Sequence, residues 1–102
     1  MSLRLHADAS VEATQTAQWY EQQRPGLGVE FLTALSDAYQ AIQANPLKYP
    51  RADEAPPEVE FRSYALRRFP HVVHYHVGLN LILVLAVAHT SRSPGYWLRR
   101  FS

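Results

Sequence analysis

Arginine carries nearly all of the fixed positive charge in this chain and is the residue type with the clearest chemical potential. Lys48 is the only lysine among ten basic residues. A guanidinium offers a planar fork of N–H donors that suits carboxylates, phosphates and aromatic faces. This uneven charge suggests an acidic partner, either a nucleic acid or an acidic protein segment, although charge alone favours the alternative of a solvated sheet face. The arginines of the second half are Arg62, Arg67, Arg68, Arg92, Arg99 and Arg100.

Histidine is the second residue type that could do chemistry. His89 could act as a general base, because the unperturbed pKa of an imidazole lies near neutrality. In the alternative, its ring nitrogens bond locally while the ring packs. His74 and His76 would share one face of a strand and could hold a metal ion, but zinc sites usually have three or four ligands and the sequence indicates no third. We therefore expect no metal and no cofactor.

The two tryptophans are candidates for recognition surfaces, since an indole can stack on a nucleobase. Trp97 is the better candidate, because it is flanked by Tyr96 and by Arg99 and Arg100. Trp19 is expected instead to pack in the core or in a groove that a partner fills.

Length and composition indicate one domain over residues 1–102. The chain has 102 residues, of which 47% are hydrophobic, and this is enough for one core without disulfides or metals. Cysteine is absent, which fits a reducing compartment. Residues 1–16 lack the basic start and apolar stretch of a signal peptide. The longest apolar run, 81–88, is shorter than the roughly 20 residues of a membrane-spanning helix, so we expect a cytoplasmic protein without membrane contact.

The first half of the chain predicts a strand followed by two helices. Residues 3–7 alternate between apolar and polar, as in a half-buried strand. A helix is expected over 9–23, with Asp8 or Ser10 as its cap and Pro25 as its end. After 26–28, apolar residues recur at spacings of three and four as far as Asn45-Pro46, which predicts a second helix.

The second half predicts a loop and three strands. Residues 47–58 are rich in proline and carry no period, so they are expected to form a surface loop. Strands are predicted over 59–65, 66–77 and 81–89, with a hairpin turn at 77–80. Pro70 would mark a bulge or an edge-facing position. The element order predicts an α+β domain with one antiparallel sheet and the helices on one face.

A series of short motifs follows one order along nearly the whole chain. The motifs are Trp19-Tyr20-Glu21, Gln23-x-Pro25-Gly26-Leu27-Gly28, Phe31, Asn45-Pro46, Tyr49-Pro50, Arg67-Arg68-Phe69-Pro70, Tyr75, and 84–89 with Arg92, Pro94 and Tyr96-Trp97. In the order and spacing of these motifs the chain resembles the RelE/ParE superfamily, the toxin half of bacterial type II toxin–antitoxin pairs. The resemblance implies a RelE/ParE-like fold and assembly with a cognate antitoxin whose flexible segment wraps the helices and the sheet.

The superfamily contains ribosome-dependent mRNA endonucleases and ParE-like gyrase poisons. Cleavage of RNA at its 2′-hydroxyl needs a proton acceptor, a proton donor and cations for the charge on phosphorus. The resemblance implies that the nuclease branch takes these from basic residues on the central strands and from a C-terminal tyrosine or histidine. The arginine expected three residues before Tyr75 is Val72 here, and the one expected after His89 is Thr90. Tyr96 does match the C-terminal acid–base position.

The missing cations favour the ParE-like branch, in which the toxin inhibits growth by binding and poisoning DNA gyrase and has no chemistry of its own. Candidate contacts with gyrase or antitoxin are the six arginines named above together with Tyr96 and Trp97. The alternative is an mRNA interferase that acts on the ribosome and mRNA through Tyr96, Arg92 and His89. A third possibility is a degenerate homologue that keeps the fold but is not toxic.

Overall fold

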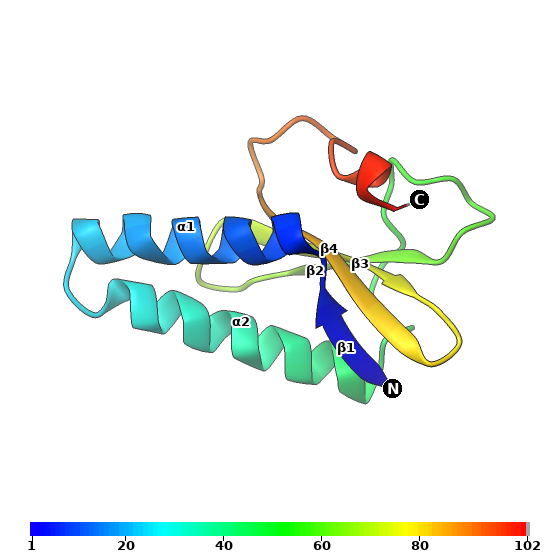
Figure 1. Cartoon of the computed structure of the whole chain (residues 1–102), viewed down its shortest axis with the longest axis horizontal. Coiled ribbons are helices and arrows are strands. Elements are labelled where there is room, and N and C mark those ends of the chain that lie inside the picture. Colours follow the sequence, from blue (N-terminus) through cyan, green and yellow to red (C-terminus); the bar gives the residue numbers. More distant parts are fainter. Residues whose placement is uncertain (102) are drawn as a thin grey trace.

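A computed structural model describes residues 1–101 and confirms the predicted α+β fold. A helical hairpin lies along one face of a four-stranded sheet, and the C-terminal segment lies on the sheet's other side (Figure 1). The elements are β1 (Ser2–Leu5), α1 (Ala7–Gln23), α2 (Leu27–Ala44), β2 (Phe61–Ala65), β3 (His71–Val77), β4 (Leu81–His89) and a short 3-10 helix, η1 (Leu98–Arg100). Among the described residues, no helix has both the length and the apolar character required to traverse a membrane.

The sheet has the strand order β1-β4-β3-β2. Strands β2, β3 and β4 pair antiparallel, as their short connections predict. Strand β1 pairs parallel with β4, from Ser2 opposite Leu81 to Leu5 opposite Val84. The sheet is therefore mixed, because β1 and β4 run in the same direction. In the sequence these two strands are separated by both helices and by β2 and β3.

The first helix begins earlier than the sequence predicts. It starts at Ala7, and its cap is His6, whose Nδ1 accepts a hydrogen bond from the Asp8 amide at 3.0 Å. The expected caps, Asp8 and Ser10, lie inside the helix. A neutral imidazole nitrogen can accept a hydrogen bond as a carboxylate or hydroxyl does, so His6 satisfies an amide that the helix leaves unpaired.

The turn between the helices depends on two glycines and one carboxylate. Gly26 has φ of 90°, in the left-handed region. The Glu21 carboxylate accepts hydrogen bonds from the amides of Gly26 at 2.9 Å and of Gly28 at 3.0 Å. At Gly28 the two helices come so close that an added Cβ would lie 2.6 Å from the Ala17 carbonyl oxygen. Any side chain at position 28 would push the helices apart.

We therefore expect Gly28→Ala to destabilise the protein by about 1–3 kcal/mol, the usual cost of overpacking. Inside an ordinary helix the same change stabilises by roughly 1 kcal/mol, so the sign of the effect is diagnostic. Urea unfolding followed by circular dichroism gives the difference. Val29→Ala, at an exposed position of the same helical turn, is the control and should change stability by less than about 0.5 kcal/mol. A stabilised Gly28→Ala protein would contradict the close packing.

Two predicted strands are shorter in the structure. The strand expected over 59–65 begins at Phe61, and the one expected over 66–77 begins at His71. Residues 66–70 form a turn. Pro70 belongs to this turn, where its carbonyl accepts a hydrogen bond from the Thr90 amide at 3.0 Å, so the expectation that it marks a bulge or an edge position is wrong. The irregularity in the sheet lies in β4, where Leu85 is an extra residue opposite His74 and Tyr75.

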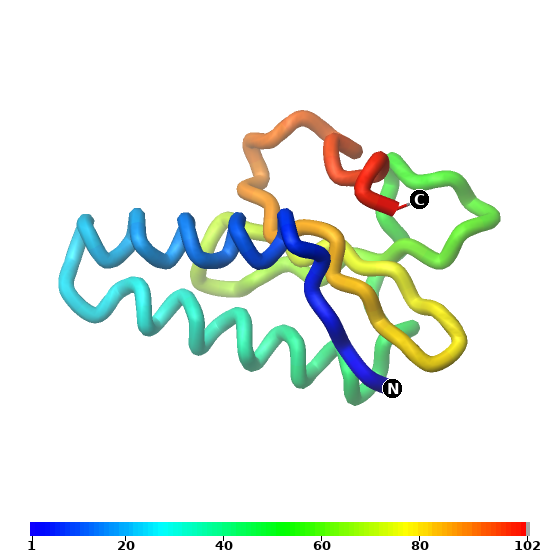
Figure 2. Tube along the Cα trace, in the orientation of Figure 1, coloured from blue at the N-terminus to red at the C-terminus, as the bar shows by residue number. Residues whose placement is uncertain are grey.

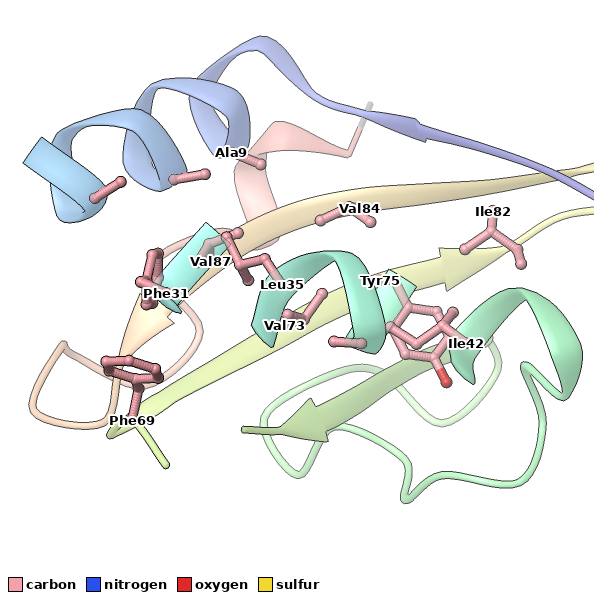
Figure 3. Packing of buried hydrophobic residues seen from close by; sticks show 13 residues of the cluster. Ala9, Phe31, Leu35, Ile42, Phe69, Val73, Tyr75, Ile82, Val84 and Val87 are labelled. Carbon is pink, nitrogen blue, oxygen red and sulfur yellow. The ribbon is translucent and has the colours of Figure 1, made fainter. Parts of the chain in front are cut away.

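The core has two parts, one on each face of the sheet. Between the helices and the sheet, side chains from α2 interdigitate with alternate residues of β3 and β4 (Figure 3). On β4, Ile82 and Val84 belong to this core, and after the extra residue the pattern resumes at Val87. On the opposite face, Leu85, Ala86 and Ala88 pack under the C-terminal segment and the loop before β2. The loop and the C-terminal segment lie side by side (Figure 2), which explains why β4 is apolar on both faces.

Candidate functional surface

The candidate site residues predicted from the sequence fall into three groups according to their surroundings in the structure. Arg92, Tyr96 and Arg100 converge on Glu12 of α1, which sequence reasoning did not single out. Arg62 and Trp97 are held inside the structure. Arg67, Arg68, His89 and Arg99 are exposed.

The Glu12 carboxylate is the centre of the first group. Its Oε2 accepts hydrogen bonds from the Tyr96 hydroxyl at 2.7 Å and from Arg100 Nη2 at 2.9 Å. Its Oε1 accepts from Arg100 Nη1 at 3.0 Å and from the Val87 amide at 3.0 Å. The side chains of Glu12 and Arg100 are only 15% and 13% exposed, so this is a shielded, bidentate ion pair.

The backbone of β4 explains why this pair forms. Strand β1 ends at Leu5, so its pairing with β4 stops at Val84, and the extra residue Leu85 follows directly. Beyond that point Glu12 accepts from the Val87 amide, and Arg100 Nη1 donates to the Leu85 carbonyl at 2.8 Å. The pair thus supplies hydrogen bonds to backbone groups that a strand would otherwise satisfy, and it ties the C-terminus to α1.

The pair also sets the proton affinities at this site. Burial alone would raise the pKa of Glu12, but hydrogen bonds from Arg100, Tyr96 and Val87 outweigh it and hold the pKa below its ordinary value. Burial and the hydrogen bond to Glu12 raise the pKa of Tyr96. The Arg92 guanidinium lies over the Tyr96 ring, 3.8 Å from its centroid. The Tyr96 hydroxyl therefore keeps its proton and donates a hydrogen bond to a neighbouring carboxylate, so it is poorly placed to take a proton from a substrate.

Trp97 does not form an exposed surface, so that expectation is wrong. Its side chain is 1% exposed and stacks on the His74 ring, with centroids 4.7 Å apart. His74 also hydrogen-bonds the Ser63 hydroxyl at 2.7 Å, and Phe101 lies over His76 at 4.2 Å. The C-terminal aromatic residues thus cover the sheet face on which His74 and His76 lie. No three metal-ligating side chains come together within residues 1–101.

Arg62 is also occupied within the protein. Its guanidinium donates to the Glu60 carboxylate at 2.6 Å and to the Tyr49 carbonyl at 2.8 Å, and its side chain is 18% exposed. Arg51 donates to the same carboxylate at 2.9 Å. These bonds fasten the loop before β2 to the sheet edge, so Arg62 has a structural role in this conformation.

The remaining cations face solvent. Arg68 pairs with Glu30 of α2 at 2.6 Å but stays 63% exposed, while Arg67 and Arg99 form no ion pair within the described chain. His89 is exposed, and its Nδ1 accepts a hydrogen bond from the Ser91 amide at 3.0 Å. The local bonding considered for His89 therefore holds for one ring nitrogen, although the ring is not packed in the core.

Trp19 is exposed rather than part of the core. It is 56% exposed and borders a pocket of about 540 Å³ between α1 and the adjacent ends of β3 and β4. His71, which is not among the candidate site residues predicted from the sequence, lies at the base of this pocket and is 4% exposed. Burial and the nearby His89 lower the pKa of His71 to about 4.

Residues 3–94 match the family model described as ParE toxin of type II toxin–antitoxin system, parDE. The chain belongs to the ParE toxin family. The matched span of this ParE-family protein includes Glu12 and Arg92 and ends before Tyr96 and Arg100. No curated protein matches the chain.

A solved structure supports the fold of the ParE-family protein. It is titled "Chromosomal ParDE TA system from P. aeruginosa", and it superimposes with a TM-score of 0.65 at 19% sequence identity. The similarity covers 87% of this chain and 95% of the other. At this level of identity the comparison establishes a shared fold.

Proposed function

We propose that this ParE-family protein is a cytoplasmic toxin that binds and poisons DNA gyrase and that a cognate antitoxin neutralises. Membership of the family supports the toxin role. The hydrogen bonding of Tyr96 is the observation that favours action by binding over catalysis. Its hydroxyl is occupied by Glu12, and burial and this bond raise its pKa. An action through binding needs no free acid–base group.

The central strands give further support. Within β3 and β4 there is no lysine or arginine, and the C-terminal segment covers the face opposite the helices. Phosphoryl-transfer chemistry on RNA relies on cations aimed at the phosphorus, and each absent one would cost several kcal/mol of transition-state stabilisation. Central strands without such cations favour a protein that acts by occupying a surface of its target.

The alternative mRNA interferase has one observation in its favour. The Arg92 guanidinium and the Tyr96 ring are in contact, so a cation and a potential acid–base group do lie together. In that reading, Glu12 would have to release the Tyr96 hydroxyl when the ribosome binds. Tyr96→Phe separates the two functions, because it removes the hydroxyl and keeps the ring on which Arg92 lies.

The test is a supercoiling assay with purified gyrase and excess toxin, beside an analysis of mRNA integrity in cells that express the toxin. We expect supercoiling to stop, gyrase–DNA cleavage complexes to accumulate, and mRNA to stay intact. Tyr96→Phe should inhibit gyrase within about threefold of the wild type, because the hydroxyl bonds only within the toxin. Normal supercoiling with excess toxin would contradict the proposal. Codon-aligned mRNA cleavage that Tyr96→Phe abolishes would establish the interferase, and undisturbed growth would establish a degenerate toxin.

A further inference from the structure

The pocket beside Trp19 has an aromatic base, and one of its lining residues, His71, carries a buried polar atom that has no partner within residues 1–101. The Tyr20 ring packs edge-to-face on Phe69 with centroids 4.9 Å apart, and the His71 ring lies 5.1 Å from Phe31 and 5.2 Å from His89. His71 Nδ1 is buried and has no hydrogen-bond partner in the described chain. Such an atom is costly and rare in a native protein. The lining residues are Gln15, Thr16, Trp19, Tyr20, Pro70, His71 and His89.

The helix face that borders the pocket carries almost no charge. Of the exposed residues from Ser10 to Gln23, only Glu21 is ionisable, and it is engaged with the turn amides of Gly26 and Gly28. The others are serine, valine, threonine, glutamine and tryptophan. Solvent-facing helix surfaces are normally charged, whereas the centre of a protein interface is depleted in charge and enriched in aromatic residues.

Exposed arginines lie in the two turns that adjoin the pocket-lining residues Pro70 and His89. The turn that contains Pro70 carries Arg68, and the turn after His89 carries Arg92, with side chains 63% and 53% exposed. Neither turn, over 66–70 or 89–95, contains an acidic residue. Arg68 has one carboxylate neighbour, Glu30 at 2.6 Å, and Arg92 has one, Glu12 at 3.9 Å. Each guanidinium keeps solvent-facing N–H groups that can donate hydrogen bonds to a further carboxylate.

We propose that this pocket receives an aromatic side chain from an acidic segment of the antitoxin. The inference rests on the proposed function for the identity of the partner, while the ligand chemistry comes from the pocket itself. The aromatic ring packs against Trp19, Tyr20 and His71. Carboxylates on either side of that ring in the antitoxin segment bind Arg68 and Arg92. The uncharged outer face of α1 continues the contact along the helix.

The first experiment uses three short peptides as probes: a phenylalanine between pairs of glutamates, the same peptide with alanine, and the same peptide with lysines for glutamates. Binding is followed by NMR through the indole N–H of Trp19, and the buried indole of Trp97 serves as the internal reference. We expect the phenylalanine–glutamate peptide to bind at least tenfold more tightly than either other peptide and to shift Trp19 alone. Equal binding of the three, or shifts centred on Trp97, would overturn the proposal.

Two variants locate the binding in the pocket. Thr16→Trp fills the pocket with a large side chain. Trp19→Ala removes an exposed lining residue and should leave folding intact. Gln22→Trp is the control, because it adds a tryptophan at an exposed position of the same helix. Thr16→Trp and Trp19→Ala should each weaken peptide binding at least tenfold. Because Trp19→Ala lacks the indole reporter, its binding is followed through the ring signals of His71 and His89, which also line the pocket. Gln22→Trp should bind the peptide as the wild type does. Loss of binding in Gln22→Trp, or none in the pocket variants, would contradict the assignment.

Neutralisation in cells separates this inference from the proposed function. The toxin and its antitoxin are co-expressed, and growth is measured for the wild type and for Trp19→Ala. If the antitoxin rescues wild-type cells but not cells with Trp19→Ala, both stand. If the antitoxin rescues cells with either protein equally, the pocket assignment is contradicted and the proposed function is not. If no antitoxin rescues wild-type cells, neutralisation as part of the proposed function fails, and the peptide result remains the test of the pocket chemistry.

Discussion

Glu12→Ala is expected to destabilise the protein by about 3–5 kcal/mol, the range for removing one partner of a shielded ion pair. The change would leave the Arg100 guanidinium with a poorly compensated charge and the Val87 amide without its acceptor. It would also release the Tyr96 hydroxyl, so that the C-terminal segment loses most of its attachment to α1. Urea unfolding followed by circular dichroism measures the loss. Glu58→Ala, which removes an exposed carboxylate, is the matched control and should cost less than about 0.5 kcal/mol.

A double-mutant cycle tests whether the loss comes from the ion pair. Arg100→Ala should be costly by itself, but the double variant should cost less than the sum of the two, because it leaves no unpaired charge in the site. In a Trp19→Phe background, Trp97 becomes the only tryptophan, and its quenching by iodide reports exposure of the covered sheet face. Additive costs, or a Trp97 that stays shielded in Glu12→Ala, would show that the pair does not hold this segment.

Acid is expected to destabilise the protein strongly between about pH 6.5 and pH 4, before most carboxylates titrate. Burial lowers the pKa of both His71 and His74 to about 4. Because these pKa values are lower in the folded protein, the unfolded chain takes up protons first, and stability falls as the pH drops through this window. Each histidine should account for up to about 2 kcal/mol between pH 7 and pH 5.

Urea unfolding at pH 7 and at pH 5 checks this expectation, and His71→Phe assigns part of it. Phenylalanine keeps a ring against Phe31 and Tyr20, and no hydrogen bond to Nδ1 is lost, because that atom has no partner in the described structure. The variant should therefore lose less stability on acidification, by up to about 2 kcal/mol. A variant as acid-sensitive as the wild type would show that His71 titrates normally in the folded protein.

The sequence allowed the main elements to be predicted, because their ends are marked by residues with strict backbone demands. Pro25 and Pro46 end the two helices near where they were expected, and β4 runs over the predicted residues. Which residues of β4 face the helices could not be predicted, since residues 81–88 are all apolar and show no alternation of apolar and polar positions. The extra residue Leu85 becomes apparent only from the register in which β4 pairs with β3.

The candidate site was harder to predict, because its contacts join distant parts of the chain. Glu12 reads as an ordinary residue on a helix, and its partners lie 75 to 88 positions away. Arg62, Trp97 and Arg100 were grouped as possible surface contacts because their residue types suit recognition, yet the same properties let them bind carboxylates and rings inside the protein. Residue type indicates what a side chain can bind, and only the fold decides which partner it meets.

The parallel pairing of β1 with β4 has a consequence for synthesis of the protein. Within the described chain, the first strand finds its only strand partner in residues 81–84, and Glu12 meets Arg100, which lies 88 positions further along the chain. Contacts of such high sequence separation form late and slow folding. A ribosome that has not yet made residues 81–100 therefore carries a helical hairpin without its sheet, and the domain can close only after these residues have been synthesised.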